Sequence, residues 1–175
     1  MKAIETRYAG YRFRSRLEAR WAVVFDDLGI KYLYEPEGYR FDDGTEYLPD
    51  FYLPDCKQFF EVKGVLSEKD DHKIKQLIAA GEKVTVGYDE FEFTYNSTDP
   101  ETKYLSFLIK CHKCGKYYFT NAEDRKCPAC GHRIEAVELH YYTSGERFGK
   151  YGTELEVQEA IIKAKEARFE KEAKQ

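Results

Sequence analysis

The first half of the chain alternates between segments with the apolar period of a helix and segments with that of a strand. The helical period predicts one helix over 14–28, ended by Gly29, and a second that Ser67 caps and Gly81 ends. The apolar positions that mark them recur at intervals of three and four residues: Leu17, Trp21, Val24 and Leu28, then Ile74, Leu77 and Ile78. Both helices are therefore expected to be amphipathic, with one face buried against a core.

Short apolar runs predict strands before and after the second helix. These runs lie at 30–34, 39–41, 46–53, 58–65 and 83–88. Asp42-Asp43-Gly44 has the residues of a hairpin turn, and Pro54-Asp55 those of a second turn. Residues 11–90 thus run helix, three antiparallel strands, helix, strand. This order predicts an α/β core, a mixed central sheet flanked by helices.

A linker is expected after this core, because Asn96-Ser97-Thr98-Asp99-Pro100 is rich in turn-forming residues. We divide the chain into a core over 1–95, a linker over 96–104, a cysteine-bearing unit of short strands over 105–150 and a charged C-terminal helix over 151–175. That helix could pack on the core or mediate a homodimer.

Composition restricts the possible partners. The 175 residues carry 28 Lys and Arg against 32 Asp and Glu, a net charge of −4, which excludes a global basic field for holding a polyanion. A local basic island lies at 7–20, where five arginines face the single acid Glu18. No window has the 18 apolar residues of a membrane span, and the N-terminus lacks the apolar stretch of a signal peptide. We therefore expect a soluble protein with no membrane partner.

Four of the five cysteines form two Cys-x-x-Cys-Gly knuckles, separated by 12 residues. Without an export signal, this spacing indicates a metal site and not a disulfide framework. We expect a ribbon in which one structural Zn²⁺ is held by Cys111, Cys114, Cys127 and Cys130. Four sulfur ligands leave no position for a substrate, so no catalysis is assigned to this zinc.

A second group of chemical interest lies on two predicted strands. Asp50 follows Pro49, and Glu61 and Lys63 share one face of the next strand, because strand side chains alternate. A hairpin would bring both acids and the lysine to one patch. Two carboxylates and the Val62 carbonyl are ligands that Mg²⁺ or Mn²⁺ accepts. Each residue taken singly is more often an exposed group or an ion-pair member.

Pro49-Asp50 followed by Glu61-Val62-Lys63 resembles the signature of the PD-(D/E)XK nucleases, which have a restriction-endonuclease-like fold. The resemblance covers about residues 11–90, and its spacing is most similar to that of phage junction resolvases of the endonuclease I type. It implies metal-dependent hydrolysis of DNA in the cytoplasm of a bacterial or phage-infected cell. Transposase nucleases and Holliday junction resolvases are other members with this signature.

The resemblance also implies residue roles. Asp50 and Glu61 would bind the metal, Lys63 would orient water, and Glu18 on the first helix would be a further ligand. Glu18 could equally pair with Arg14, four residues earlier. The residues implied to bind phosphates are Arg12, Arg14 and Arg16, and Lys73 and Gln76 on the second helix could also reach the site.

An alternative from a different functional class stays open. The chain could be a non-catalytic module whose zinc ribbon binds nucleic acid or a protein partner on a nuclease-like scaffold. Lys113 and Lys116 lie in the ribbon beside aromatic residues and could contact DNA. Stabilising the fold is a further role open to the ribbon.

Overall fold

The fold is taken from a computed structural model, which describes residues 4–89, 93–97, 107–121, 124–134 and 153–169. The helices are α1 (Arg16–Asp27), α2 (Glu68–Ala79) and α4 (Thr153–Glu166). The strands before α2 are β1 (Thr6–Tyr8), β2 (Tyr11–Phe13), β3 (Leu33–Tyr34), β4 (Tyr39–Arg40), β5 (Glu46–Tyr47), β6 (Phe51–Leu53) and β7 (Gln58–Val62). Those after it are β8 (Val84–Gly87), β9 (Phe93–Ser97), β10 (Phe107–Lys110) and β11 (Tyr117–Thr120).

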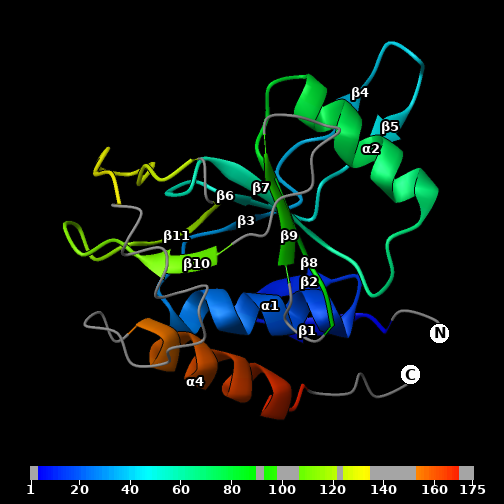
Figure 1. Cartoon of the computed structure of the whole chain (residues 1–175). Helices are drawn as coiled ribbons and strands as arrows, with labels where there is room; N and C mark the ends of the chain where they lie inside the picture. Colours follow the sequence, from blue (N-terminus) through cyan, green and yellow to red (C-terminus); the bar gives the residue numbers. More distant parts are fainter. Residues whose placement is uncertain (1–3, 90–92, 98–106, 122–123, 135–152, 170–175) are drawn as a thin grey trace.

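The central sheet has five strands in the order β3-β6-β7-β8-β9 (Figure 1). β3, β6 and β7 are antiparallel neighbours, β7 and β8 are parallel and joined through α2, and β9 returns antiparallel to β8. The expected mixed α/β class is confirmed. β4 and β5 pair with each other in a separate two-stranded sheet around the predicted Asp42-Asp43-Gly44 turn.

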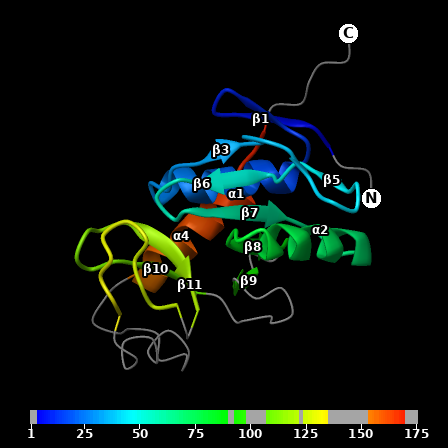
Figure 2. The same ribbon diagram turned by 90° about the horizontal axis from the view of Figure 1, so that it is seen from above.

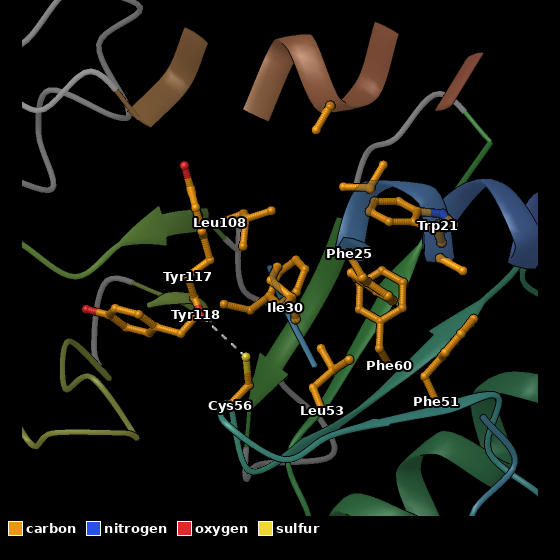
Figure 3. Close-up of a cluster of buried hydrophobic side chains, with 14 of the residues drawn as sticks. Trp21, Phe25, Ile30, Phe51, Leu53, Cys56, Phe60, Leu108, Tyr117 and Tyr118 are labelled. Carbon is orange, nitrogen blue, oxygen red and sulfur yellow. Dashed lines mark hydrogen bonds between the residues drawn. The ribbon is translucent and has the colours of Figure 1, made fainter. Parts of the chain in front are cut away.

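Helices α1 and α2 cover opposite faces of this sheet. Successive side chains along β7 therefore point alternately to the α1 side and to the α2 side. Phe60 packs against Trp21 and Phe25 on the α1 side, with ring centroids 4.7 and 5.1 Å apart (Figure 3). Phe59, its neighbour, belongs to the second cluster, which contains the apolar face of α2. β7 is buried along its whole length. A polar residue on this strand is therefore enclosed by two apolar layers.

The cysteine-bearing hairpin β10–β11 and α4 join the α1 side of the core. The Phe119 ring lies 5.2 Å from that of Phe60, and Ala160 and Ala164 on α4 are fully buried. α4 runs alongside α1, as both views show (Figure 2). The ribbon and the C-terminal helix thus share one hydrophobic cluster with the sheet. None of the helices in the described ranges is long and apolar enough to cross a membrane.

Several element boundaries differ from those predicted. α1 begins at Arg16, because Ser15 is the N-cap and accepts a hydrogen bond from the Glu18 amide. The run at 30–34 forms a strand only at Leu33–Tyr34, and the run at 58–65 stops at Val62. β9 extends to Ser97, so the first two residues of the expected linker belong to the sheet, where Ser97 pairs with Val84.

The hairpin of β1 and β2 was not predicted. Its turn is Ala9-Gly10, and both residues have positive φ, of 48° and 83°. This is the backbone conformation of a tight hairpin turn of the primed type. Of the predicted linker and ribbon, residues 98–106, 122–123 and 135–150 lie outside the described residues, as do 151–152 and 170–175 of the predicted C-terminal helix.

Candidate metal-binding and catalytic sites

Asp50, directly before β6, lies beside Glu61 on the antiparallel strand β7. Phe51 is opposite Phe60 in the register, which places Asp50 across from Glu61. The Asp50 amide donates to Glu61 Oε2 over 3.1 Å. Both residues are only 2 % exposed. The hairpin that the sequence predicts therefore does bring these two carboxyl groups together, inside the protein.

Two cations neutralise part of this buried charge. Lys63 Nζ lies 2.5 Å from Glu61 Oε1, as expected for two residues on one strand face. Arg14 donates to Asp50 Oδ1 over 2.8 Å, and the Val62 amide donates to Asp50 Oδ2 over 2.8 Å. Every carboxylate oxygen of the pair thus has one donor. Val62 contributes to this network through its amide. Binding of a metal ion by its carbonyl stays a prediction.

Glu18 is also buried beside this pair, but it is held in a way that the sequence did not predict. Its Oε2 accepts hydrogen bonds from the Tyr34 hydroxyl at 2.6 Å and from the Arg14 amide at 3.0 Å. The Arg14 guanidinium instead contacts Asp50 and Glu35. The expected side-chain ion pair between Arg14 and Glu18 was therefore wrong, since the arginine reaches across to the sheet. Tyr34 had no signal in the sequence that could have identified it.

The electrostatics of the group favour an added positive charge. Burial, and then the neighbouring Glu61 carboxylate, raise the pKa of Asp50 well above its usual range, although Lys63 opposes the shift. Burial lowers the pKa of Lys63, but Glu61 and Asp50 outweigh this effect, so its pKa is raised overall. With Glu18 and Glu35 included, four carboxyl groups surround the two cations. A divalent ion bound here would offset this excess of negative charge.

A pocket of about 650 Å³ opens over Glu61 and Lys63. It is walled by the β4–β5 hairpin, by the segment that follows β5 and by α2. Its lining residues are Arg14, Gly38, Tyr39, Arg40, Glu46, Tyr47, Leu48, Glu61, Lys63, Asp70 and Lys73. Burial, and then the Glu61 carboxylate, raise the pKa of Tyr47 well above its usual range. The polar centre of the sheet is thus accessible from one side.

The four cysteines of the two knuckles converge at the end of the β10–β11 hairpin. Their sulfur atoms all lie within 4.8 Å of one another, with 3.6 Å between Cys111 and Cys130 and 3.7 Å between Cys114 and Cys127. A tetrahedral zinc with Zn–S bonds of about 2.3 Å needs sulfur separations of about 3.8 Å. The set therefore fits a structural zinc ion. Within the described ranges, these four cysteines form the group of three or more potential metal ligands whose ligand atoms converge so closely.

Each knuckle is closed by its glycine. The Gly115 amide donates to the Cys111 carbonyl over 2.7 Å, and the Gly131 amide donates to the Cys127 carbonyl over 2.8 Å. Both glycines have a φ of 73°, which residues with a Cβ rarely adopt. Cys111 and Cys127 are buried, whereas Cys114 and Cys130 are exposed.

The basic residues predicted to bind nucleic acid lie in different surroundings. Arg12 and Arg14 are both exposed; Arg12 pairs with Glu5, whereas the Arg14 guanidinium reaches the buried Asp50. Arg16 is half-buried at the start of α1. In the ribbon, Lys116 forms a 2.6 Å salt bridge with Asp55, and Lys113 is exposed. The structure does not gather these five residues on one surface around the pocket, and their contact with DNA stays a prediction.

Comparisons with protein-family models, with curated proteins and with solved structures found no match to this chain.

Proposed function

We propose that this protein is a metal-dependent DNA endonuclease with a restriction-endonuclease-like core and a structural zinc ribbon. One observation carries the proposal. Asp50 and Glu61 are buried side by side, and Glu61 pairs with Lys63 where both line an open pocket. Burying two adjacent carboxyl groups is costly unless they bind a cation or perform chemistry, so such a pair suggests a functional site.

The order of the elements supports the fold assignment. α1 carries Glu18, the antiparallel pair β6–β7 carries Asp50 and Glu61, and α2 then leads to the parallel strand β8. This is the order implied by the resemblance to the PD-(D/E)XK nucleases. A protein with this activity would work in the cytoplasm of a bacterial or phage-infected cell, in the processing of branched or damaged DNA, in restriction or in transposition.

Asp50, Glu61 and the Val62 carbonyl would hold the Mg²⁺ or Mn²⁺ ion, with Glu18 close by. An ion bound there would supply an activated water molecule and offset charge on the scissile phosphate. Lys63, whose Nζ lies next to Glu61, would donate a hydrogen bond to that water or to the phosphate. Hydrolysis would add the water oxygen to phosphorus and transfer a proton to the departing 3′ oxygen. The products would be a 5′-phosphate and a 3′-hydroxyl.

A panel of DNA substrates tests the proposal. Purified protein is incubated with duplex, single-stranded and branched DNA in the presence of Mg²⁺ or Mn²⁺. We expect cleavage of at least one substrate, and at least a 100-fold loss of rate in Asp50→Asn, Glu61→Gln and Lys63→Ala. Glu166→Gln, at an exposed position on α4, is the matched control and should cleave normally. Cleavage that persists in the variants carrying both Asp50→Asn and Lys63→Ala would refute the assignment.

A second function is favoured by one feature of the same site. Each oxygen of Asp50 and Glu61 already accepts from Arg14, Lys63 or a backbone amide, so the network can be a purely structural one. The chain would then be a non-catalytic module that binds DNA or a protein through its ribbon. Calorimetry with Mg²⁺ and Mn²⁺ separates the two functions. A nuclease should show a binding site that Glu61→Gln abolishes at constant zinc content, and a binding module should show none.

A further inference from the structure

The pocket above Glu61 and Lys63 is also lined by two basic residues that the buried pair does not use. The sequence predicted that Lys73 could reach the site, and it gave no role to Arg40. Arg40 comes from β4 and Lys73 from α2, and both line the pocket. The β4–β5 hairpin and α2 lie next to each other on the side of the sheet away from α4 (Figure 1). The two cations therefore flank the entrance to the candidate catalytic residues.

These two cations differ from the others of the site in having no acidic partner in the part of the chain that the structure describes. Arg14 and Lys63 are both held by carboxylates. Within the described ranges, Arg40 and Lys73 form no salt bridge. Lys73 Nζ is instead placed 5.8 Å from the centroid of the Tyr47 ring, an arrangement that holds an ammonium group without neutralising it. Both charges remain available to an anion.

Glu46 and Tyr47 also line the pocket next to these two cations. Glu46 is opposite Arg40 in the β4–β5 register, yet no oxygen of Glu46 lies within salt-bridge distance of a described cation. Tyr47 is buried, and the neighbouring Glu61 carboxylate acts on its hydroxyl.

The hairpin that carries Arg40 is fixed relative to the helix that carries Lys73. Asp43, in the hairpin turn, accepts hydrogen bonds from His72 and Gln76 on α2, each over 2.8 Å. The Thr45 amide also donates to Asp43 over 2.8 Å, which holds the turn in shape. The two elements that carry Arg40 and Lys73 are therefore tied to each other before any ligand binds, and this reduces the entropy lost on binding.

We propose that Arg40 and Lys73 bind backbone phosphates of DNA next to the scissile bond. The inference rests on the proposed nuclease function and adds to it the residues that hold the substrate over Glu61 and Lys63. Phosphates are the expected ligand because two separated cations at the mouth of an open groove match successive negative charges along a DNA strand.

Binding measured without cleavage tests this proposal. Fluorescence anisotropy is recorded with a labelled duplex and a labelled four-way junction, in buffer without added magnesium and over a range of salt concentrations. The double variant Arg40→Gln/Lys73→Gln is compared with wild type. Arg168→Gln, an exposed arginine beyond the end of α4, is the matched control for loss of charge. Glu46→Gln removes a carboxylate from the same rim, and circular dichroism confirms that each variant is folded.

We expect the double variant to bind about tenfold or more weakly at 0.1 M salt, with a salt dependence that is less steep by about 1.8 in log K against log salt concentration. Arg168→Gln should bind like wild type, and Glu46→Gln should bind more tightly. Wild-type affinity in the double variant, or an equal loss in Arg168→Gln, would overturn the inference. If the double variant loses binding while wild type shows no magnesium-dependent cleavage, the phosphate site stands and the nuclease proposal fails.

Discussion

Asp50 and Glu61 are joined in both directions between their two strands. The Asp50 amide donates to the Glu61 carboxylate, and the Asp50 carboxylate accepts from the amide of Val62, the residue after Glu61. Each acid is thus positioned by the backbone of the strand that carries the other. Such backbone-fixed carboxyl groups lose little freedom on binding a cation, which is the property that a metal site requires.

The buried pair should make the stability of the protein fall as the pH rises. Because the pKa of Asp50 is raised in the folded state by burial and by Glu61, the native protein holds a proton that the unfolded chain releases near pH 3.9. The free energy of unfolding therefore decreases as the pH rises from about 4 towards the raised pKa. Asp50→Asn removes this proton. In urea unfolding at several pH values, the free energy of unfolding of Asp50→Asn should increase relative to that of wild type as the pH rises. A difference that does not change with pH would contradict the prediction.

Divalent cations should stabilise wild-type protein through the same pair. At a free Mg²⁺ or Mn²⁺ concentration of 100 times Kd, the free energy of unfolding should rise by about 2.7 kcal/mol. Thermal melts measure this as an increase in Tm. Glu61→Gln should lose the increase, and Glu166→Gln should keep it. An equal rise in Tm in all three proteins would mean that the cations bind elsewhere.

Zinc removal should unfold more than the ribbon. A structural zinc contributes an apparent 10–16 kcal/mol in small zinc-binding peptides, which is comparable to the whole stability of a typical domain of about 5–15 kcal/mol. Cys127→Ser should therefore lose zinc, measured by atomic absorption, and lose cooperative unfolding. Cys56→Ala is the control, because Cys56 is also buried but its Sγ contacts the Tyr117 carbonyl at 3.6 Å and lies outside the zinc set. It should retain one zinc per chain.

Gly87 on β8 should not tolerate a side chain. A Cβ atom there would overlap the Phe60 ring and lie 2.8 Å from Trp21 Cε2. Gly87→Ala should cost about 1–3 kcal/mol by overpacking the core. Gly64→Ala, where no heavy atom lies within 4 Å of the added carbon, should change the stability far less. Chemical denaturation of both variants checks the difference, and equal stabilities would show that the rings can shift freely.

The fold was largely predictable where capping and turn residues, which act on nearby atoms, agree with the packing of the whole structure. Ser67 caps α2 in a full capping box with Asp70, and Gly29 follows α1 with a φ of 65°. These residues determine the ends of helices through nearby atoms only. The short hairpin β1–β2 was missed because its strands have three residues each and no alternating pattern. Its turn is formed by Ala9, which rarely adopts positive φ.

The candidate site was predictable in part for a similar reason. Asp50, Glu61 and Lys63 meet because of strand alternation and a single turn, which the sequence reveals. Arg14 reaches Asp50 over 36 positions of the chain, and Tyr34 reaches Glu18 over 16. Contacts at these separations depend on how α1 crosses the sheet. No local pattern in the sequence encodes that crossing, so the arginine was assigned the wrong partner.

The contact between Phe119 and Phe60 joins the cysteine-bearing hairpin to the strand that carries Glu61. Phe60 is the residue before Glu61, and its ring is covered on one side by the hairpin that bears the cysteines. A lineage that discarded the ribbon would leave this ring in water and would need a new apolar residue to replace Phe119. Exchange of the ribbon for another module by recombination is hindered for the same reason. Replacement of the zinc-bearing segment should therefore destabilise the strand that carries Glu61.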